Sequence, residues 1–140
     1  MIRLYVDAST KGNPGPCGVG IVILKDQEQL QISQPLVHNY TNHEAEFIAL
    51  ITGLNILLEH HWENEWVSIH SDSKIVVQSI EKQYTKKPEF QKLLKGALQQ
   101  LQKFPLHSLT WIPEKQNQGA DHLARQALQK RLKEQKNNTN

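Results

Sequence analysis

The stretch MIRLYVDASTKGNPGPCGVGIVI, residues 1–23, starts as a run of strand-forming residues, turns sharply and resumes as a second apolar run. The alternation over residues 2–8 predicts a half-buried strand. Residues 12–16 (GNPGP) are typical of a turn, and residues 17–25 predict the next strand. Because the link is short, we expect the two strands to be antiparallel neighbours. The first strand ends with a lone carboxylate, Asp7, which raises the question of its partners.

The rest of the chain predicts three further strands and four helices. Apolar residues that recur with helical spacing mark the helices, and short apolar runs mark the strands. The strand–helix–strand links favour parallel pairing of the first strand with the fourth, and hence a mixed α/β sheet. We expect strands near 28–36, 66–71 and 107–112, and helices from Thr41 to about 58, over about 73–82, through 90–101, and from Asn117 onward.

The composition is that of one globular domain. The chain has 140 residues, of which 38% are hydrophobic and 21% charged. It contains no apolar run long enough for a membrane helix, and charges interrupt the first apolar stretch, so we expect no secretory signal. The single cysteine, Cys17, excludes an internal disulfide and suits a reducing cytoplasm. We expect a domain over residues 1–133, followed by a polar tail, 134–140, that frays.

The net charge of +2 conceals an uneven distribution. Residues 44–65 hold five acidic residues and no lysine or arginine, whereas residues 74–103 hold seven lysines and two glutamates. This segregation predicts a basic face beside a separate acidic site, as a protein that binds a polyanion would have. Lys86 and Lys87 are the centre of the basic segment. The alternative is a solvated helix surface with no ligand.

Four acidic residues stand at the ends of predicted elements. Asp7 and Asp72 each end a strand, and parallel pairing would set them side by side. Thr41 and Glu44 fit a capping box, so Glu44 has a structural role at the helix start. Residues two apart on a helix face about 200° apart, which makes Glu46 the better candidate to face the strand ends. The fourth acid, Asp121, lies near the start of the last helix.

Each of these acids alone has an ordinary explanation as a turn, cap or helix-dipole residue. Together they would repel one another unless a cation lay between them. Hard oxygen ligands with little histidine favour Mg²⁺ over zinc.

The sequence resembles type 1 ribonuclease H, and in particular its compact bacterial branch. Four blocks occur in the family order with matching spacing, and together they cover residues from about 2 to 130. The blocks are Asp7-Ala8-Ser9 with Gly12-Asn13-Pro14-Gly15, Thr41-Asn42 with Ala45-Glu46, Ser71-Asp72-Ser73, and Ala120-Asp121-x-Leu123-Ala124.

The resemblance implies a ribonuclease H-like fold with a five-stranded mixed sheet, strand order 3-2-1-4-5, and helices on both faces. It implies endonucleolytic cleavage of the RNA strand of RNA–DNA hybrids, leaving 5′-phosphate and 3′-hydroxyl ends. Two Mg²⁺ ions, for which Mn²⁺ is a possible substitute, would act during catalysis. We expect a monomer with no obligatory protein partner and no membrane contact. The metal-binding catalytic acids carried over are Asp7, Glu46, Asp72 and Asp121.

The same resemblance implies contacts to the hybrid. Asn13 and Asn42 would lie near the minor groove, Thr41 would meet a DNA phosphate, and the turn at Gly12 would bring backbone close to nucleic acid. Such contacts, together with Lys86 and Lys87, would distinguish RNA from DNA without reading base sequence.

One departure from the family concerns the segment 113–119 (PEKQNQG), which lacks the histidine that many relatives carry there. Glu114 and Lys115 are the candidate substitutes. This departure keeps open a catalytically weak, nucleic-acid-binding relative as the main alternative. A proofreading-type exonuclease is disfavoured by Ser9, which stands where that class has glutamate. A dinucleotide-binding protein is disfavoured because the turn after the first strand opens no helix.

Overall fold

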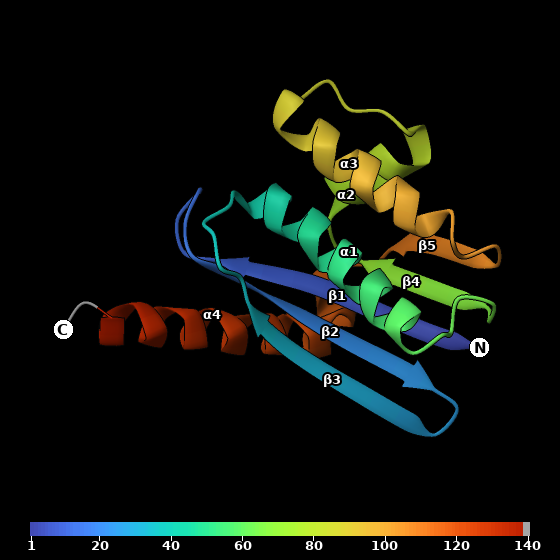
Figure 1. The fold of residues 1–140 in the computed structure, drawn as a ribbon, viewed down its shortest axis with the longest axis horizontal. Helices are drawn as coiled ribbons and strands as arrows, with labels where there is room; N and C mark the ends of the chain where they lie inside the picture. The colour runs from blue at the N-terminus through green and yellow to red at the C-terminus, as the bar shows by residue number, and fades with distance from the viewer. Residues whose placement is uncertain (139–140) are drawn as a thin grey trace.

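The computed structural model describes residues 1–138, and its centre is a single five-stranded sheet in the order β3-β2-β1-β4-β5 (Figure 1). The first three strands are joined antiparallel, and β1, β4 and β5 run parallel. The predicted sheet and strand order are confirmed. The strands are β1 (Ile2–Thr10), β2 (Cys17–Lys25), β3 (Glu28–Pro35), β4 (Val67–Ser71) and β5 (His107–Trp111).

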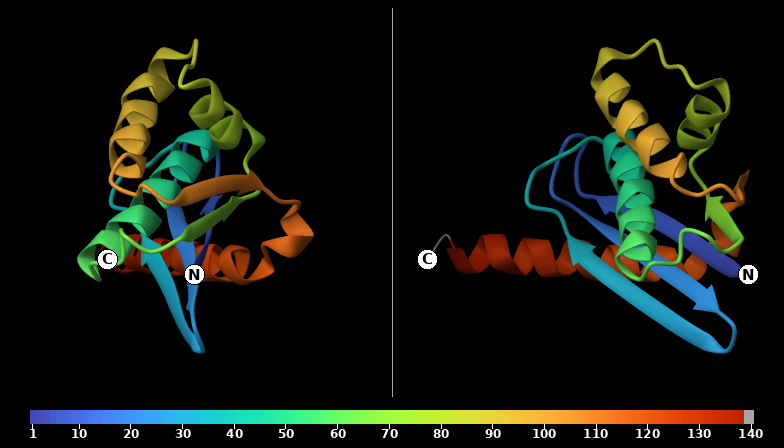
Figure 2. Two further views of the ribbon diagram at one scale, coloured as in Figure 1. Left: turned by 90° about the vertical axis from the view of Figure 1, so that its right-hand side faces the viewer. Right: turned by 45° about the vertical axis from the view of Figure 1, so that its right-hand side comes forward.

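Helices cover both faces of the sheet, as expected (Figure 2). On one face α1 packs against β1 and β2, with α2 and α3 beside it. On the other face α4 crosses β1, β2 and β3. The helices are α1 (Asn42–Glu59), α2 (Lys74–Lys82), α3 (Pro88–Leu101) and α4 (Gln118–Asn138), and a short 3₁₀ helix, η1 (Glu114–Gln116), precedes α4.

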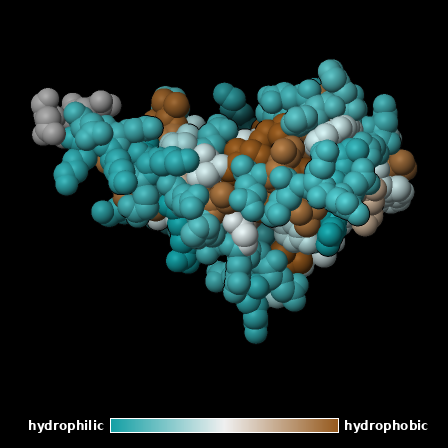
Figure 3. Space-filling model, turned by 90° about the horizontal axis from the view of Figure 1, so that it is seen from below, coloured by the Kyte–Doolittle hydropathy of each residue, from teal (hydrophilic) through white to brown (hydrophobic). Residues whose placement is uncertain are grey.

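The main core lies between the sheet and α1. Alternation in β1 points Ile2, Leu4 and Val6 toward this helix, where all three are almost fully buried. Gly53 allows α1 to approach β1 closely, since a Cβ there would lie 3.0 Å from Val6 Cγ1. The surface seen from below is mostly hydrophilic, with a hydrophobic area near its centre and smaller hydrophobic patches elsewhere (Figure 3). The buried apolar side chains come from the strands and from the helices packed on them, so they fix the sheet against its helices.

On the opposite face, α4 approaches β2 even more closely. A Cβ on Gly20 would lie 2.0 Å from the Ala120 carbonyl oxygen, and one on Gly18 would lie 2.4 Å from Ala127 Cβ. Backbone meets backbone at Gly20, so no side-chain movement can relieve an added methyl group. This contact sets the position of the first turns of α4, which carry Asp121.

The segment expected to be a polar tail, residues 134–140, overlaps the last helix. Helix α4 continues to Asn138, so residues 134–138 are helical, and residues 139–140 lie outside the described residues. The physical reason is the composition of this segment, whose lysine, glutamate and glutamine are good helix formers. Arg131 also ties the helix to the loop after β3, donating to the carbonyl oxygens of Leu36 and His38. Within residues 1–138, none of the helices has both the length and the apolar content to span a bilayer.

Two glycine substitutions test the close packing of α4. Gly20→Ala should lower the free energy of unfolding by more than about 2 kcal/mol, because the added methyl group meets α4 backbone. Gly96→Ala is the matched control, since its Cβ would find only Ile51 Cδ1 at 3.6 Å. It should raise stability by up to about 1 kcal/mol through helix propensity. Urea denaturation of both variants measures the difference, and equal effects would contradict the tight crossing.

Candidate active site

The parallel ladder between β1 and β4 brings two of the predicted acids together. Val6 pairs with Ser71 at the end of this ladder. The next residues of the two strands therefore lie side by side: Asp7, which stays within β1 and pairs with Gly20 of β2, and Asp72, which directly follows β4. Asp7 is only 8% exposed, so its carboxylate is largely removed from water.

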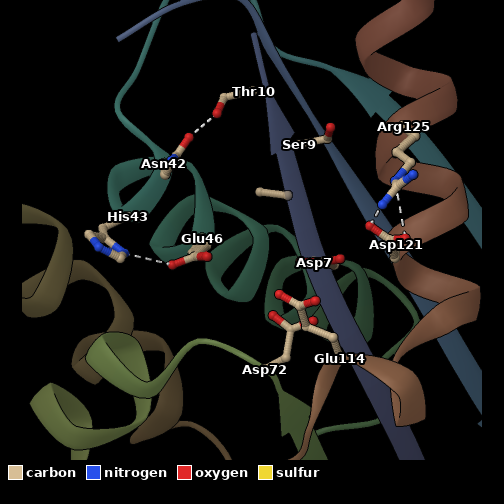
Figure 4. A pocket seen from close by; sticks show the side chains of 11 residues that line it. Asp7, Ser9, Thr10, Asn42, His43, Glu46, Asp72, Glu114, Asp121 and Arg125 are labelled. Carbon is tan, nitrogen blue, oxygen red and sulfur yellow. Dashed lines mark hydrogen bonds and ion pairs between the residues drawn. The ribbon is translucent and has the colours of Figure 1, made fainter. Parts of the chain in front are cut away.

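All four predicted acids line one open pocket at this edge of the sheet (Figure 4). They come from four elements or their ends: β1, α1, the residue after β4, and the first turns of α4. Asn42, His43 and Arg125 line the pocket as well. The acidic residues of the lining are Asp7, Glu46, Asp72, Glu114 and Asp121.

The start of α1 determines which glutamate reaches the pocket. Thr41 and Glu44 form the predicted capping box, with Thr41 N–H donating to Glu44 Oε1 at 2.9 Å and Glu44 N–H donating to Thr41 Oγ1 at 3.3 Å. Glu46 instead faces the pocket. There its Oε2 accepts a hydrogen bond from Ser73 Oγ at 2.6 Å and contacts His43 Nδ1 at 3.0 Å.

Asp72 is held by a buried amide. Asn117, which is 1% exposed, donates from Nδ2 to the Val6 carbonyl oxygen at 2.9 Å and to Asp72 Oδ2 at 3.2 Å. The indole nitrogen of Trp111 donates to the Asp72 carbonyl oxygen at 3.0 Å. One amide thus links Val6, within β1, to the acid that follows β4.

Asp121 is paired within its own helix. Arg125 Nε lies 3.1 Å from Asp121 Oδ2 and 3.2 Å from Oδ1. In Figure 4 this pair lies on the other side of β1 from Glu46. The arginine side chain is 71% exposed, so the ion pair is a solvated one.

The pocket concentrates uncompensated negative charge. Burial, and then the neighbouring Asp72 carboxylate, raise the pKa of Asp7 to about 8, although the Ala8 backbone N–H opposes the shift. Burial also raises the pKa of Asp72 above its ordinary value, against the hydrogen bond from Asn117. A proton or a cation is therefore favoured between these groups at neutral pH.

The donor set fits a hard divalent cation. Carboxylate oxygens dominate the lining, and Mg²⁺ is a cation that prefers oxygen ligands. Among residues 1–138, however, no three Asp, Glu, His or Cys side chains already stand as a closed metal cage. One of the acids, Asp121, is instead paired with Arg125. Asp7, Glu46, Asp72 and Asp121 are the residues that would hold the ion.

The residues expected to contact nucleic acid fall into two groups. Beside the pocket, the loop after β1 meets the start of α1: Asn13 Oδ1 accepts from Asn42 N–H at 2.9 Å, and the Thr10 hydroxyl donates to Asn42 Oδ1. Gly12 in this loop has a left-handed φ of 88°, which suits glycine. The Thr41 hydroxyl accepts from Glu44 N–H in its cap, which leaves its hydrogen to be donated to a phosphate.

Lys86 and Lys87 form the second group, in the link between α2 and α3. They line a separate groove with Tyr84 and Phe90. Lys87 Nζ lies 5.4 Å from the centre of the Phe90 ring, and this ring meets His43 edge-on with centres 6.0 Å apart. His43 and Phe90 therefore connect the basic groove to the acidic pocket.

Sequence reasoning missed two basic residues of the pocket, His43 and Arg125, and gave Ser73 no role. Their spacing held a signal, since His43 precedes Glu46 by three residues and Arg125 follows Asp121 by four. Glu114 lines the pocket from η1. His122, the residue after Asp121, does not line the pocket: it is exposed on α4 and contacts Gln126.

Comparison with known proteins agrees with this geometry. The family described as reverse transcriptase-like matches residues 5–127. In structure, the chain superposes on LC11-RNase H1, isolated from compost, with a TM-score of 0.84 and 29% identity, covering 94% of this chain and 97% of that one. The chain belongs to the type 1 ribonuclease H family. Family membership makes it an enzyme of the hydrolase class.

Two sequence relatives define its position in the family. "Putative hydrolase EbsB" of Enterococcus faecalis is 53% identical over 131 residues, 93% of this chain and 96% of the relative. Ribonuclease HI of Halobacterium salinarum is 29% identical over 129 residues, which make up 91% of this chain and 64% of that protein. A ribonuclease H1 structure from the same archaeon has a TM-score of 0.81 at 27% identity, covering 92% of this chain and 98% of that one.

The buried acid at the centre of the pocket predicts a pH-dependent stability. The pKa of Asp7 rises from 3.8 to about 8 on folding. Between these values the folded state holds the extra proton, so in metal-free buffer stability should fall as pH rises, by up to about 1.4 kcal/mol per pH unit. Asp7→Asn should remove this loss and raise the melting temperature at pH 8, measured by calorimetry in chelator.

Glu59→Gln is the control for that experiment, because Glu59 is exposed at the far end of α1. It should keep the pH dependence of the wild type. If Asp7→Asn also keeps it, burial and repulsion do not govern this carboxylate.

Proposed function

We propose that the protein hydrolyses the RNA strand of RNA–DNA hybrids as an endonuclease. The observation that carries the proposal is the convergence of Asp7, Glu46, Asp72 and Asp121, from four elements, on one pocket. The family supports it, and so does the structural similarity to LC11-RNase H1 in complex with an RNA/DNA hybrid, with a TM-score of 0.82 at 26% identity over 94% of this chain and 99% of that one. We expect the protein to act as a monomer.

The pocket residues would have distinct tasks. Two bound Mg²⁺ ions, or Mn²⁺ in their place, would supply an activated water and stabilise the leaving 3′ oxygen, which gives 5′-phosphate and 3′-hydroxyl products. Asp7 is the most buried of the four acids and would be the central ligand. Glu46 and Asp72, each held by hydrogen bonds, would keep fixed orientations. Asp121 would turn from Arg125, whose guanidinium is exposed.

Glu114 takes the place in the pocket where a loop histidine would be expected from the family. It lies on η1, which is one turn long and directly precedes the Asn117 that holds Asp72. A carboxylate there can accept a hydrogen bond from water and orient it, but it cannot donate while ionised. We infer an auxiliary role for Glu114, secondary to the four acids.

Recognition of the hybrid would use both groups of polar residues. Asn13 and Asn42, joined by the hydrogen bond from Asn42 N–H to Asn13 Oδ1, offer side-chain amides beside the pocket, and the backbone at Gly12 adds an N–H group. A-form duplexes present 2′-hydroxyls in a wide, shallow minor groove, which suits such contacts. Lys86 and Lys87 would contact phosphates at a distance from the chemistry.

Strand-specific cleavage tests this function. RNA–DNA, RNA–RNA and DNA–DNA duplexes with each strand labelled are incubated with Mg²⁺, and only the RNA strand of the hybrid should be cut. Glu46→Gln should reduce the rate at least a hundredfold, since it removes a metal-binding charge. Glu44→Gln is the matched control and should retain near wild-type activity, because glutamine can still accept in the capping box.

Two results would contradict the proposal. A wild-type protein that binds the hybrid without cutting it would support the alternative, a nucleic-acid-binding relative with weak catalysis. Equal loss in Glu44→Gln and Glu46→Gln would mean that the start of α1, rather than one carboxylate, is what activity requires.

The role of the basic groove is tested by salt. If Lys86 and Lys87 contact phosphates, replacing both by alanine should weaken hybrid binding and reduce the slope of log affinity against log salt by roughly one to two. Lys130→Ala with Lys133→Ala is the charge-matched control, because both lysines are exposed on α4. Binding isotherms at several salt concentrations measure the slopes. If the slopes of the two double variants do not differ, the groove is only a solvated surface.

A further inference from the structure

The carboxylate of Glu46 receives both of its contacts at the same oxygen. Ser73 Oγ lies 2.6 Å from Oε2, and His43 Nδ1 lies 3.0 Å from it. Within residues 1–138 the structure records no contact to Oε1. Since a carboxylate only accepts, Nδ1 of His43 must carry the hydrogen in this contact. The neutral imidazole with hydrogen on Nδ1 suffices, so the arrangement requires no change of charge.

Ser73 fixes this oxygen from the far side. The residue is buried and caps α2, where its Oγ accepts from Val76 N–H at 3.3 Å. A hydroxyl has one hydrogen, and with Oγ accepting at the cap that hydrogen goes to Glu46. The serine therefore combines a structural role with the positioning of the glutamate.

His43 completes the arrangement from the first turn of α1. Its side chain is 42% exposed and lines the acidic pocket. Its ring is held edge-on against Phe90, with the planes at 87°. A histidine on an open helix surface would rotate freely, whereas this one is held between a buried aromatic ring and a carboxylate.

We propose that His43 is a positioning residue for Glu46: with Ser73 it occupies Oε2 and leaves Oε1 as the oxygen presented to a divalent cation. This inference rests on the proposed metal-dependent function. The physical basis is that an unrestrained glutamate side chain must lose rotational freedom when it binds an ion, and prior hydrogen bonding removes part of that cost. Partners of this kind commonly change metal affinity or activity by 10–100-fold.

The competing explanation is a surface contact with no consequence. Partly exposed pairs three residues apart on a helix add only a few tenths of a kcal/mol to stability. Such a contact would leave metal binding untouched when it is removed. The two explanations therefore differ in metal affinity rather than in stability.

Two substitutions separate the explanations. His43→Ala removes the donor, whereas His43→Asn keeps one, because the amide nitrogen of asparagine can take the position of Nδ1. Binding of Mn²⁺ alone is measured by calorimetry without nucleic acid, together with the Mg²⁺ dependence of kcat. His43→Ala should weaken Mn²⁺ binding about tenfold and raise the half-saturating Mg²⁺ concentration similarly. His43→Asn should stay within about threefold of the wild type.

The outcomes are distinct from those of the functional assay. Unchanged Mn²⁺ affinity in His43→Ala would overturn the inference even if the hybrid is cleaved. Equal weakening in both variants would also overturn it, since loss of the ring against Phe90 would then be the cause. A wild type that binds Mn²⁺, shows the expected difference between the two variants and yet leaves the hybrid intact would support the positioning role while refuting the proposed function.

Discussion

The register of β1 against β4 is the constraint on which the site depends. Because Val6 pairs with Ser71, the two residues that follow, Asp7 and Asp72, must lie side by side. If β4 were shifted by one residue against β1, the two carboxylates would lie on opposite faces of the sheet. The crossing of α4 over Gly20 and the capped start of α1 then place Asp121 and Glu46 around the same pocket.

This convergence opposes stability. Burial and mutual repulsion raise the pKa values of Asp7 and Asp72, so ionising these carboxyl groups costs more free energy in the folded chain than in the unfolded chain. Hydrogen bonds offset part of the cost, from Asn117 to Asp72 and from Ser73 to Glu46. The apolar core beneath the central strand β1 must supply the rest of the stabilising free energy that this acidic pocket requires.

Much of this architecture could be predicted from the sequence. Alternation in β1, the turn after it and the capping box at Thr41 are local signals, and the structure confirms each of them. The spacing of the two basic residues of the pocket predicts a contact with an acid on the same helix, but not that they line the pocket. His43 and Arg125 look like ordinary helix-surface residues until the fold shows that their faces line the pocket. The polar composition of residues 134–138 suits both a solvated helix and a frayed end, so the sequence alone does not choose between them.

The four acids differ in how firmly they are held. Asp7, Asp72 and Glu46 are buried or bonded to groups from other elements, so moving them would disturb the fold. Asp121 has only an exposed arginine of its own helix, and pairs of this type contribute about 0.3–0.5 kcal/mol. A divalent cation attracts a carboxylate far more strongly than that. In the metal site proposed above, three ligands would therefore be preset and Asp121 would turn toward the ion.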